Sequence, residues 1–137
     1  MRPNPKNNDV TEIELYPEVE ISDSNDVINI LIKHDHFSSD NEYGRLLLEH
    51  LMDSLLSSPA KIGVLFIVDK GTHLLDRDDD LHDKVLELCR KADLCLISEE
   101  SIEYYSISCD DDISSYLSPD ERITSLIIES VPLLILE

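Results

Sequence analysis

The 137-residue sequence contains three glycines, three cysteines and 11 basic residues, and no long apolar run. With so few glycines, neither a G-x-G-x-x-G fingerprint nor a P-loop is present, which argues against nucleotide binding through either motif. An odd number of cysteines without metal-like spacing argues against a disulfide framework or a zinc motif and favours a reducing compartment. No segment approaches the roughly 20 apolar residues of a membrane span, and the amino terminus lacks the hydrophobic part of a signal peptide. We therefore expect a cytoplasmic protein without a membrane partner.

The sequence has 30 acidic residues against 11 basic ones, which gives a formal net charge of -19. Such a charge repels nucleic acids and anionic lipid surfaces. We expect no nucleic-acid partner, and a protein partner is expected to be basic or neutral. The same acidity is also typical of a surface that is simply kept soluble.

The most informative stretch is an unbroken apolar run from Ile62 to Val68. Its length and its β-branched residues predict a strand covered on both faces, as in a parallel sheet. The polar residues at its carboxyl end cannot continue the core, and Gly71 among them would permit a sharp turn. These residues are Asp69, Lys70, Gly71 and Thr72. Because ligands of open α/β sheets bind outside the carboxyl ends of the strands, we expect a ligand crevice at this loop.

The remaining pattern alternates strands with amphipathic helices. Further strands are expected at residues 27–32, 94–97, 113–117 and 133–136, and helices at residues 43–56, 81–92 and 119–131. Their expected N-caps are Ser39 in a capping box with Glu42 (or Asp40 or Asn41), the Asp78–Asp80 run, and Ser118 in a capping box with Glu121. We predict a three-layer α/β/α sandwich at residues 27–137, with a mainly parallel sheet of about five strands.

Residues 1–26 are expected to form a polar, partly disordered arm. Within this arm, Ile13 and Leu15 alternate with Glu12 and Glu14 before Pro17. This alternation predicts a short strand, either at an edge of the sheet or lying on a neighbouring subunit.

Three short segments follow one another at a characteristic spacing: EYG at 42–44, DKGTHL at 69–74 and SEESIEYY at 98–105. In this arrangement, residues 27–136 resemble the DsrE/DsrF-like small sulfur-relay proteins, most closely the YedF-like branch linked to selenium metabolism. The resemblance implies a DsrE-like α/β fold, assembly as a trimer or hexamer, and a partner protein in sulfur relay.

The sequence departs from that branch where its cysteine pair would lie. Ser98 and Ser101 stand at these positions, and a serine hydroxyl cannot form a persulfide or exchange with a thiol. The sulfur-carrier-like amino-terminal domain of longer members is also expected to be absent. We therefore expect a non-catalytic binding or scaffold protein of sulfur or selenium metabolism that uses no cofactor, rather than a sulfurtransferase-like enzyme.

Cys109 is the one cysteine expected to be accessible. Cys89 and Cys95 lie at apolar positions of a predicted helix and strand, which is typical of small core residues. Cys109 lies in a polar loop, but the carboxylates at 110–112 oppose thiolate formation. An alternative function is an active sulfur carrier that uses Cys109 as a relocated persulfide thiol.

His34 and His36 flank Asp35 at the end of the first strand, and Asp69 and His73 could approach from the second. Imidazole and carboxylate groups suit zinc or another divalent metal. Alternate residues of an extended loop point in opposite directions, so a solvated loop is favoured. A small-ligand or metal-binding module is a further alternative.

Ser98, Ser101 and Tyr104 follow the third predicted strand and are expected to line the same crevice as Asp69. A serine-hydrolase role is not favoured, because no G-x-S-x-G elbow surrounds these serines and glutamates stand next to them. Tyr104 and Tyr105 together could line a crevice, but the favoured interpretation of the pair is one ring in the core and one at an interface.

Overall fold

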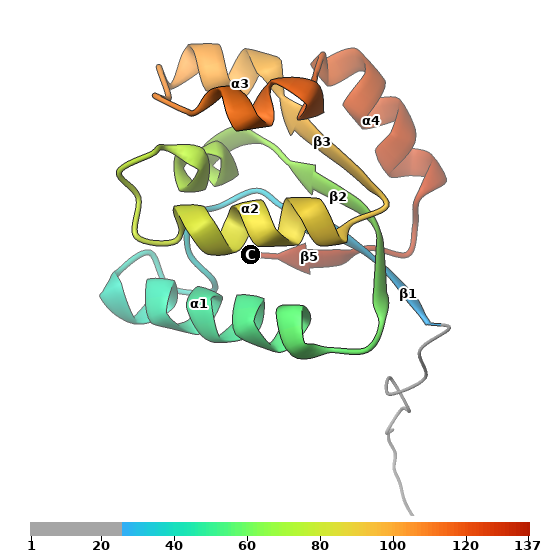
Figure 1. Ribbon diagram of the computed structural model, residues 1–137, viewed down its shortest axis with the longest axis horizontal. Coiled ribbons are helices and arrows are strands. Elements are labelled where there is room, and N and C mark those ends of the chain that lie inside the picture. The colour runs from blue at the N-terminus through green and yellow to red at the C-terminus, as the bar shows by residue number, and fades with distance from the viewer. Residues whose placement is uncertain (1–25) are drawn as a thin grey trace, which may run out of the picture.

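Residues 26–137 are described by a computed structural model, in which they form a three-layer sandwich around a five-stranded sheet (Figure 1). The strands are β1 (Val27–Ile32), β2 (Lys61–Ile67), β3 (Leu94–Ser98), β4 (Leu117–Ser118) and β5 (Leu134–Leu136). Their order in the sheet is β4-β3-β2-β1-β5, and all four pairings are parallel. The predicted fold class is confirmed. The strand predicted near Ile13 and Leu15 lies outside the described residues.

Four α-helices and two 3-10 helices connect the described strands. The α-helices are α1 (Glu42–Ser57), α2 (His82–Lys91), α3 (Glu99–Tyr104) and α4 (Asp120–Glu129), and the 3-10 helices are η1 (Asp69–Leu75) and η2 (Asp111–Tyr116). None of these helices is long and apolar enough to cross a membrane.

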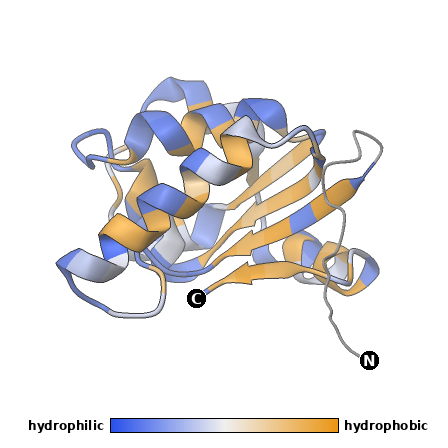
Figure 2. Ribbon diagram, turned by 90° about the horizontal axis from the view of Figure 1, so that it is seen from below, coloured by the Kyte–Doolittle hydropathy of each residue, from blue (hydrophilic) through white to orange (hydrophobic). Residues whose placement is uncertain are grey.

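The two faces of the sheet are covered by different helices. Helices α1 and α2 lie in front of the sheet in Figure 1, and buried side chains such as Met52 and Val85 join their apolar stripes to Ile30 and Leu65. Helix α4 covers the opposite face, where Ile123 packs in a smaller cluster. Figure 2 shows this helix across the sheet from α1 and α2, and the strands between them are almost uniformly hydrophobic. The continuous apolar runs of the sequence therefore correspond to strands buried on two faces.

Helix α1 begins as one of the expected alternatives, and α4 does not begin as expected. Asn41 caps α1 by accepting a hydrogen bond from the Gly44 amide at 3.0 Å. The N-cap of α4 is Pro119, without a side-chain bond. The predicted capping box at Ser118 is wrong because Ser118 is buried in β4, where it pairs with Ser98 of β3.

Two further expectations are corrected. The strand predicted at residues 113–117 is mostly the 3-10 helix η2, and β4 keeps only its last residue together with Ser118. Helix α2 begins at His82, and its N-cap Leu81 provides no side-chain bond. The predicted carboxylates act one turn earlier, where Asp79 accepts a hydrogen bond from the Leu81 amide at 2.9 Å.

Parallel strands place all five carboxyl ends at one edge of the sheet. The chain steps from β1 through β2 and β3 to β4, and α4 then returns it to β5 on the other side of β1. Ligands of open α/β sheets bind at this edge, and the site candidates from the sequence lie along it.

Candidate ligand-binding crevice

The turn at the end of β2 is made by Asp69, not by Gly71. Asp69 has a φ of 52°, in the left-handed region that non-glycine residues rarely adopt. No glycine of the described chain has a positive φ, and Gly71 is buried in η1. A Cβ atom on Gly71 would lie 2.7 Å from the Ile32 carbonyl oxygen. Gly71 is therefore required for close packing against β1, which corrects the expected role.

Asp69 is the member of the 69–72 loop that lines a cavity. Thr72 is fully buried, and its hydroxyl donates a hydrogen bond to the Asp69 carbonyl at 2.7 Å. Lys70 is exposed beside it. The carboxylate of Asp69 accepts a hydrogen bond from the Tyr105 hydroxyl at 2.6 Å. The loop therefore presents one carboxylate to the crevice, fixed by a tyrosine of the neighbouring connection.

Ser98 and Ser101 join the ends of three elements by hydrogen bonds. Ser98 is fully buried, and its hydroxyl caps α3 by accepting from the Ser101 amide at 2.9 Å. The same hydroxyl donates to the Asp120 carboxylate at 2.5 Å. The Ser101 hydroxyl accepts from the Asp69 amide at 2.9 Å. The two serines thus fix the ends of β2 and β3 to the first residue of α4.

Two adjoining hollows share Asp69, Ser101 and Asp120 as lining residues. The first is a polar cavity of about 250 Å³ and the second an apolar cavity of about 310 Å³. The polar cavity is completed by Glu100, Tyr104 and Tyr105, and the apolar cavity by Val68, Ile123, Thr124 and Ile127. We call the two cavities together the crevice.

The lining of the crevice is acidic and aromatic. Asp69, Glu100 and Asp120 contribute three carboxylates, and none of the described residues that line either cavity is basic. Tyr104 is 81% exposed and meets Tyr105 edge-to-face, with ring centroids 5.0 Å apart. The hydrogen bond to Asp69, together with burial, raises the pKa of Tyr105 to about 12. Tyr105 therefore stays protonated as a donor at neutral pH.

Glu100 and Asp120 of the polar cavity are not among the residues expected at the crevice from the sequence, and neither are the residues that line only the apolar cavity. Glu100 lies in the short helix α3 and Tyr105 is the C-cap of this helix; none of the six α3 residues is buried, so no apolar periodicity marks the helix in the sequence. Asp120 falls within the helix predicted at 119–131, and only Pro119 separates it from the end of β4. Because the strand predicted at 113–117 ends beside this helix start, the rule that places ligands at the carboxyl ends of strands points to Asp120 as well.

The three cysteines are free thiols with different surroundings. Cys89 and Cys95 are buried, as predicted, and a hydrogen bond from Cys89 together with burial raises the pKa of Cys95. Cys109 is half-buried, and burial raises the pKa of its thiol above the usual value. Arg77 donates to the Cys109 carbonyl at 3.0 Å and so fixes this loop. The loop thiol is accessible but is not activated by its environment.

His34 and His36 stack on each other, with ring centroids 4.9 Å apart and an interplanar angle of 15°. Asp69 and His73, which could have approached the histidine pair, both contact Tyr105 instead. The His73 ring lies 4.8 Å from the Tyr105 ring. The carboxylates beside the histidine pair come from their own loop.

No family model matches this chain, and neither the curated proteins nor the solved structures provide a match.

Proposed function

We propose that this protein is a cysteine-independent binding protein whose crevice takes a cationic group on an aliphatic stem. The observation that carries the proposal is the convergence of Asp69, Glu100 and Asp120 around the polar cavity without a basic residue in its lining. Carboxylates accept hydrogen bonds from ammonium and guanidinium groups and attract their charge. Tyr104 and Tyr105 offer aromatic faces, which also attract cations.

The apolar cavity on the other side of Asp69 and Asp120 extends this specificity. Val68, Ile123 and Ile127 line it, and the methylene groups of a lysine-like chain would cover such a surface while the charged head stays among the carboxylates. A lysine or arginine side chain of a basic partner, or a free alkylamine, has this combination of stem and charge. A net charge of -19 would speed the encounter with such a ligand.

The resemblance to the YedF-like branch suggests that this binding function serves sulfur or selenium metabolism. Within the proposal, Ser98 and Ser101 have replaced relay cysteines by residues that only hold the crevice in shape. The protein would then act as a cytoplasmic scaffold that binds a basic sulfur-relay partner. The alternative of a sulfur carrier acting through Cys109 is less favoured, because the raised pKa of this thiol reduces the thiolate available for persulfide formation.

We also propose that the chain forms a homo-oligomer, as a trimer or hexamer. The apolar stripe of α1 is largely used inside the protomer, but exposed apolar side chains gather where α4 leads into the edge strand β5. These are Ile128, Val131, Leu134 and Ile135. An edge strand with apolar neighbours is a surface suited to self-association. A monomeric mass in light scattering at micromolar concentration would contradict this part of the proposal.

The binding proposal is tested by calorimetry with two probes, a short lysine-containing peptide and pentylamine. Asp69→Asn and Asp120→Asn each remove one charge from the crevice and are expected to weaken binding about tenfold or more, since hydrogen bonds to charged groups contribute about 1.5–3 kcal/mol and about 1.4 kcal/mol corresponds to a factor of ten. Asp111→Asn is the matched control, because it removes the same charge from an exposed position outside the crevice.

The outcomes separate the sources of the cation. Binding of the peptide but not of pentylamine identifies a protein partner, and binding of both identifies a site for the alkylammonium group itself. If lysine acetylation of the peptide does not abolish binding, or if Asp111→Asn weakens binding as much as Asp69→Asn, the proposed function is wrong.

A further inference from the structure

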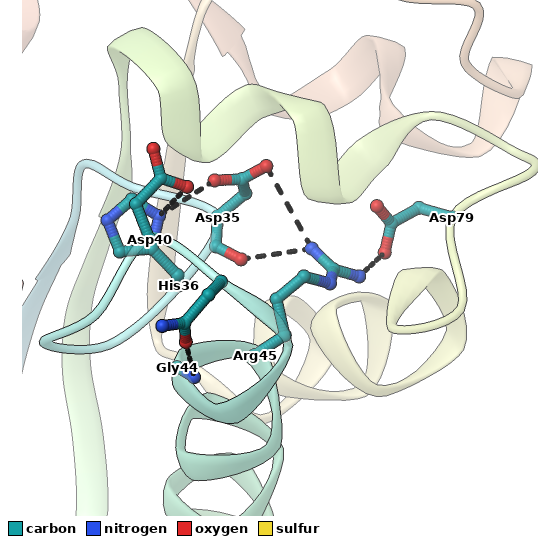
Figure 3. Close-up of polar contacts among 7 residues, drawn as sticks. Asp35, His36, Asp40, Gly44, Arg45 and Asp79 are labelled. Carbon is teal, nitrogen blue, oxygen red and sulfur yellow. Dashed lines mark hydrogen bonds and ion pairs between the residues drawn. The ribbon is translucent and has the colours of Figure 1, made fainter.

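A second polar cluster lies at the carboxyl end of β1, away from the crevice. It consists of Asp35, His36 and Asp40, whose nearest ligand-type atoms all lie within 4.8 Å of one another. Figure 3 shows the two carboxylates pointing toward the same edge of the imidazole ring. The Nδ1 atom of His36 is 3.0 Å from Asp35 Oδ1 and 3.4 Å from Asp40 Oδ1. We propose that these three side chains form a binding site for a divalent transition-metal ion of the zinc class.

The cluster has more hydrogen-bond acceptors than protons to fill them, which favours a bound cation. Both carboxylate oxygens carry lone pairs, and Nδ1 of His36 carries either a lone pair or the one proton that can lie between them. That proton can satisfy one carboxylate well but not both. A metal ion would be shared by all three atoms, which makes it a better counter-charge than the single proton.

Two of the three separations in the cluster suit a small ion with tetrahedral geometry, and the two carboxylate oxygens lie within 4.8 Å of each other. Two ligand atoms that each lie 2.0–2.1 Å from a tetrahedral zinc ion are about 3.3 Å apart. The separations of 3.0 and 3.4 Å from His36 Nδ1 bracket this value. One imidazole and two carboxylates form a mixed nitrogen and oxygen set, which suits zinc better than magnesium or calcium. Three protein ligands leave a fourth position open to water or a substrate.

The loop that carries the cluster is held before any ion binds. The Phe37 amide donates to the Gly44 carbonyl in α1, and the Ser38 amide donates to the Glu137 carbonyl after β5, each at 3.0 Å. His36 is 9% exposed, and its ring is stacked against His34. The Nδ1 atom of His34 is itself buried without a hydrogen-bond partner in the described structure. A fixed, buried imidazole is what a preorganised ligand requires.

Arg45 acts as a positioning residue for the cluster and does not occupy it. Its guanidinium donates to the Asp35 carbonyl at 2.9 Å and pairs with Asp79 at 2.8 Å (Figure 3). The Arg45 Nη1 atom lies 3.9 Å from Asp35 Oδ2, the carboxylate oxygen that faces away from His36. Oδ1 of Asp35 is therefore not taken by Arg45 and stays directed toward His36 Nδ1. The Asp40 side chain is 85% exposed, so the site can be reached from solvent.

The test is a calorimetric titration of the full chain with Zn²⁺ in excess Mg²⁺, which occupies the purely acidic surface. One zinc ion per chain is expected. Asp40→Asn and His36→Gln should each weaken binding by at least the 10–100-fold that loss of an outer-shell partner costs, because each removes a direct ligand. Matched controls are Asp111→Asn and His50→Gln, which change an exposed carboxylate and an exposed imidazole elsewhere and should leave the affinity unchanged.

Two controls exclude misfolding of the variants and metal binding through a cysteine thiolate. Asp40 is exposed, so Asp40→Asn tests the site even if the buried His36→Gln variant is found to be unfolded by circular dichroism without metal. With Co²⁺ in place of Zn²⁺, the absorption spectrum should lack a thiolate charge-transfer band. Absence of zinc binding, zinc binding that Asp40→Asn does not weaken, or a thiolate band that Cys109→Ser removes would each overturn the proposal. None of these results depends on the amine-binding crevice.

Discussion

The replacement Ser98→Ala probes the residue on which the crevice depends most. Its hydroxyl is fully buried, caps α3 through the Ser101 amide and donates to the Asp120 carboxylate. Loss of an N-cap costs about 1 kcal/mol. A hydrogen bond to a charged group contributes about 1.5–3 kcal/mol, and the lower end applies here because Asp120 is exposed and can regain water. We therefore expect the free energy of unfolding to fall by about 2–3 kcal/mol.

Urea denaturation followed by circular dichroism measures this loss. The transition midpoint should fall while the slope stays the same, since the surface exposed on unfolding does not change. Ser101→Ala removes one hydrogen bond between neutral groups and should cost about 1 kcal/mol. Ser115, an exposed serine of η2, provides the matched control, and its replacement by alanine should have little effect. The reasoning is refuted if Ser98→Ala costs no more than Ser115→Ala.

Three further predictions concern other residues of the sheet edge. The phenol of Tyr105, which donates to Asp69, has a pKa of about 12 in the folded protein against 10 in the unfolded chain. Its contribution to stability should be complete below pH 10 and should be lost as the pH rises toward 12. The phenolate absorbance difference between the protein and Tyr105→Phe measures this titration, and a midpoint near pH 10 would contradict the prediction. Cys109 should be alkylated more slowly at neutral pH than a cysteine in an unfolded peptide, because burial raises its pKa. Mapping by peptide mass spectrometry checks this, and an equal or faster rate would favour the alternative of a relocated persulfide thiol. Gly71→Ala should destabilise the protein by about 1–3 kcal/mol, the usual cost of overpacking, because the new Cβ would lie 2.7 Å from the Ile32 carbonyl oxygen; an unchanged melting temperature would refute this close-approach argument.

The parts of the fold that depend on long apolar patterns could be predicted from the sequence. The runs at residues 27–32 and 62–68 became β1 and β2, and the helix predicted at 43–56 became α1. The short elements were harder. Helix α3 and the 3-10 helix η2 have six residues each and are specified by local hydrogen bonds and by contact with the sheet, so no periodic signature precedes them in the sequence.

The candidate site was predictable only as far as strand ends could be placed. Asp69 and Ser101 were expected at one edge because each follows a buried strand, and both line the crevice. The backbone conformation of the turn was not predictable by residue preference, since an aspartate and not the glycine adopts the left-handed conformation. Tyr105 is recognisable in the sequence only as one of a tyrosine pair that could line a crevice, because its exact role comes from a hydrogen bond to Asp69, 36 positions away in the chain.

The carboxylates of the crevice have more hydrogen-bond acceptor sites than the fold uses. A carboxylate has about four acceptor sites. One oxygen of Asp69 accepts from Tyr105, and one oxygen of Asp120 accepts from Ser98. An asparagine keeps one acceptor oxygen for the same donor and loses the charge. Experiments can therefore separate the structural role from the binding role. Replacement of Asp69 or Asp120 by asparagine should keep the hydrogen bonds and most of the melting temperature while it removes the attraction for a cation. Ser98→Ala should instead lower the stability of the fold.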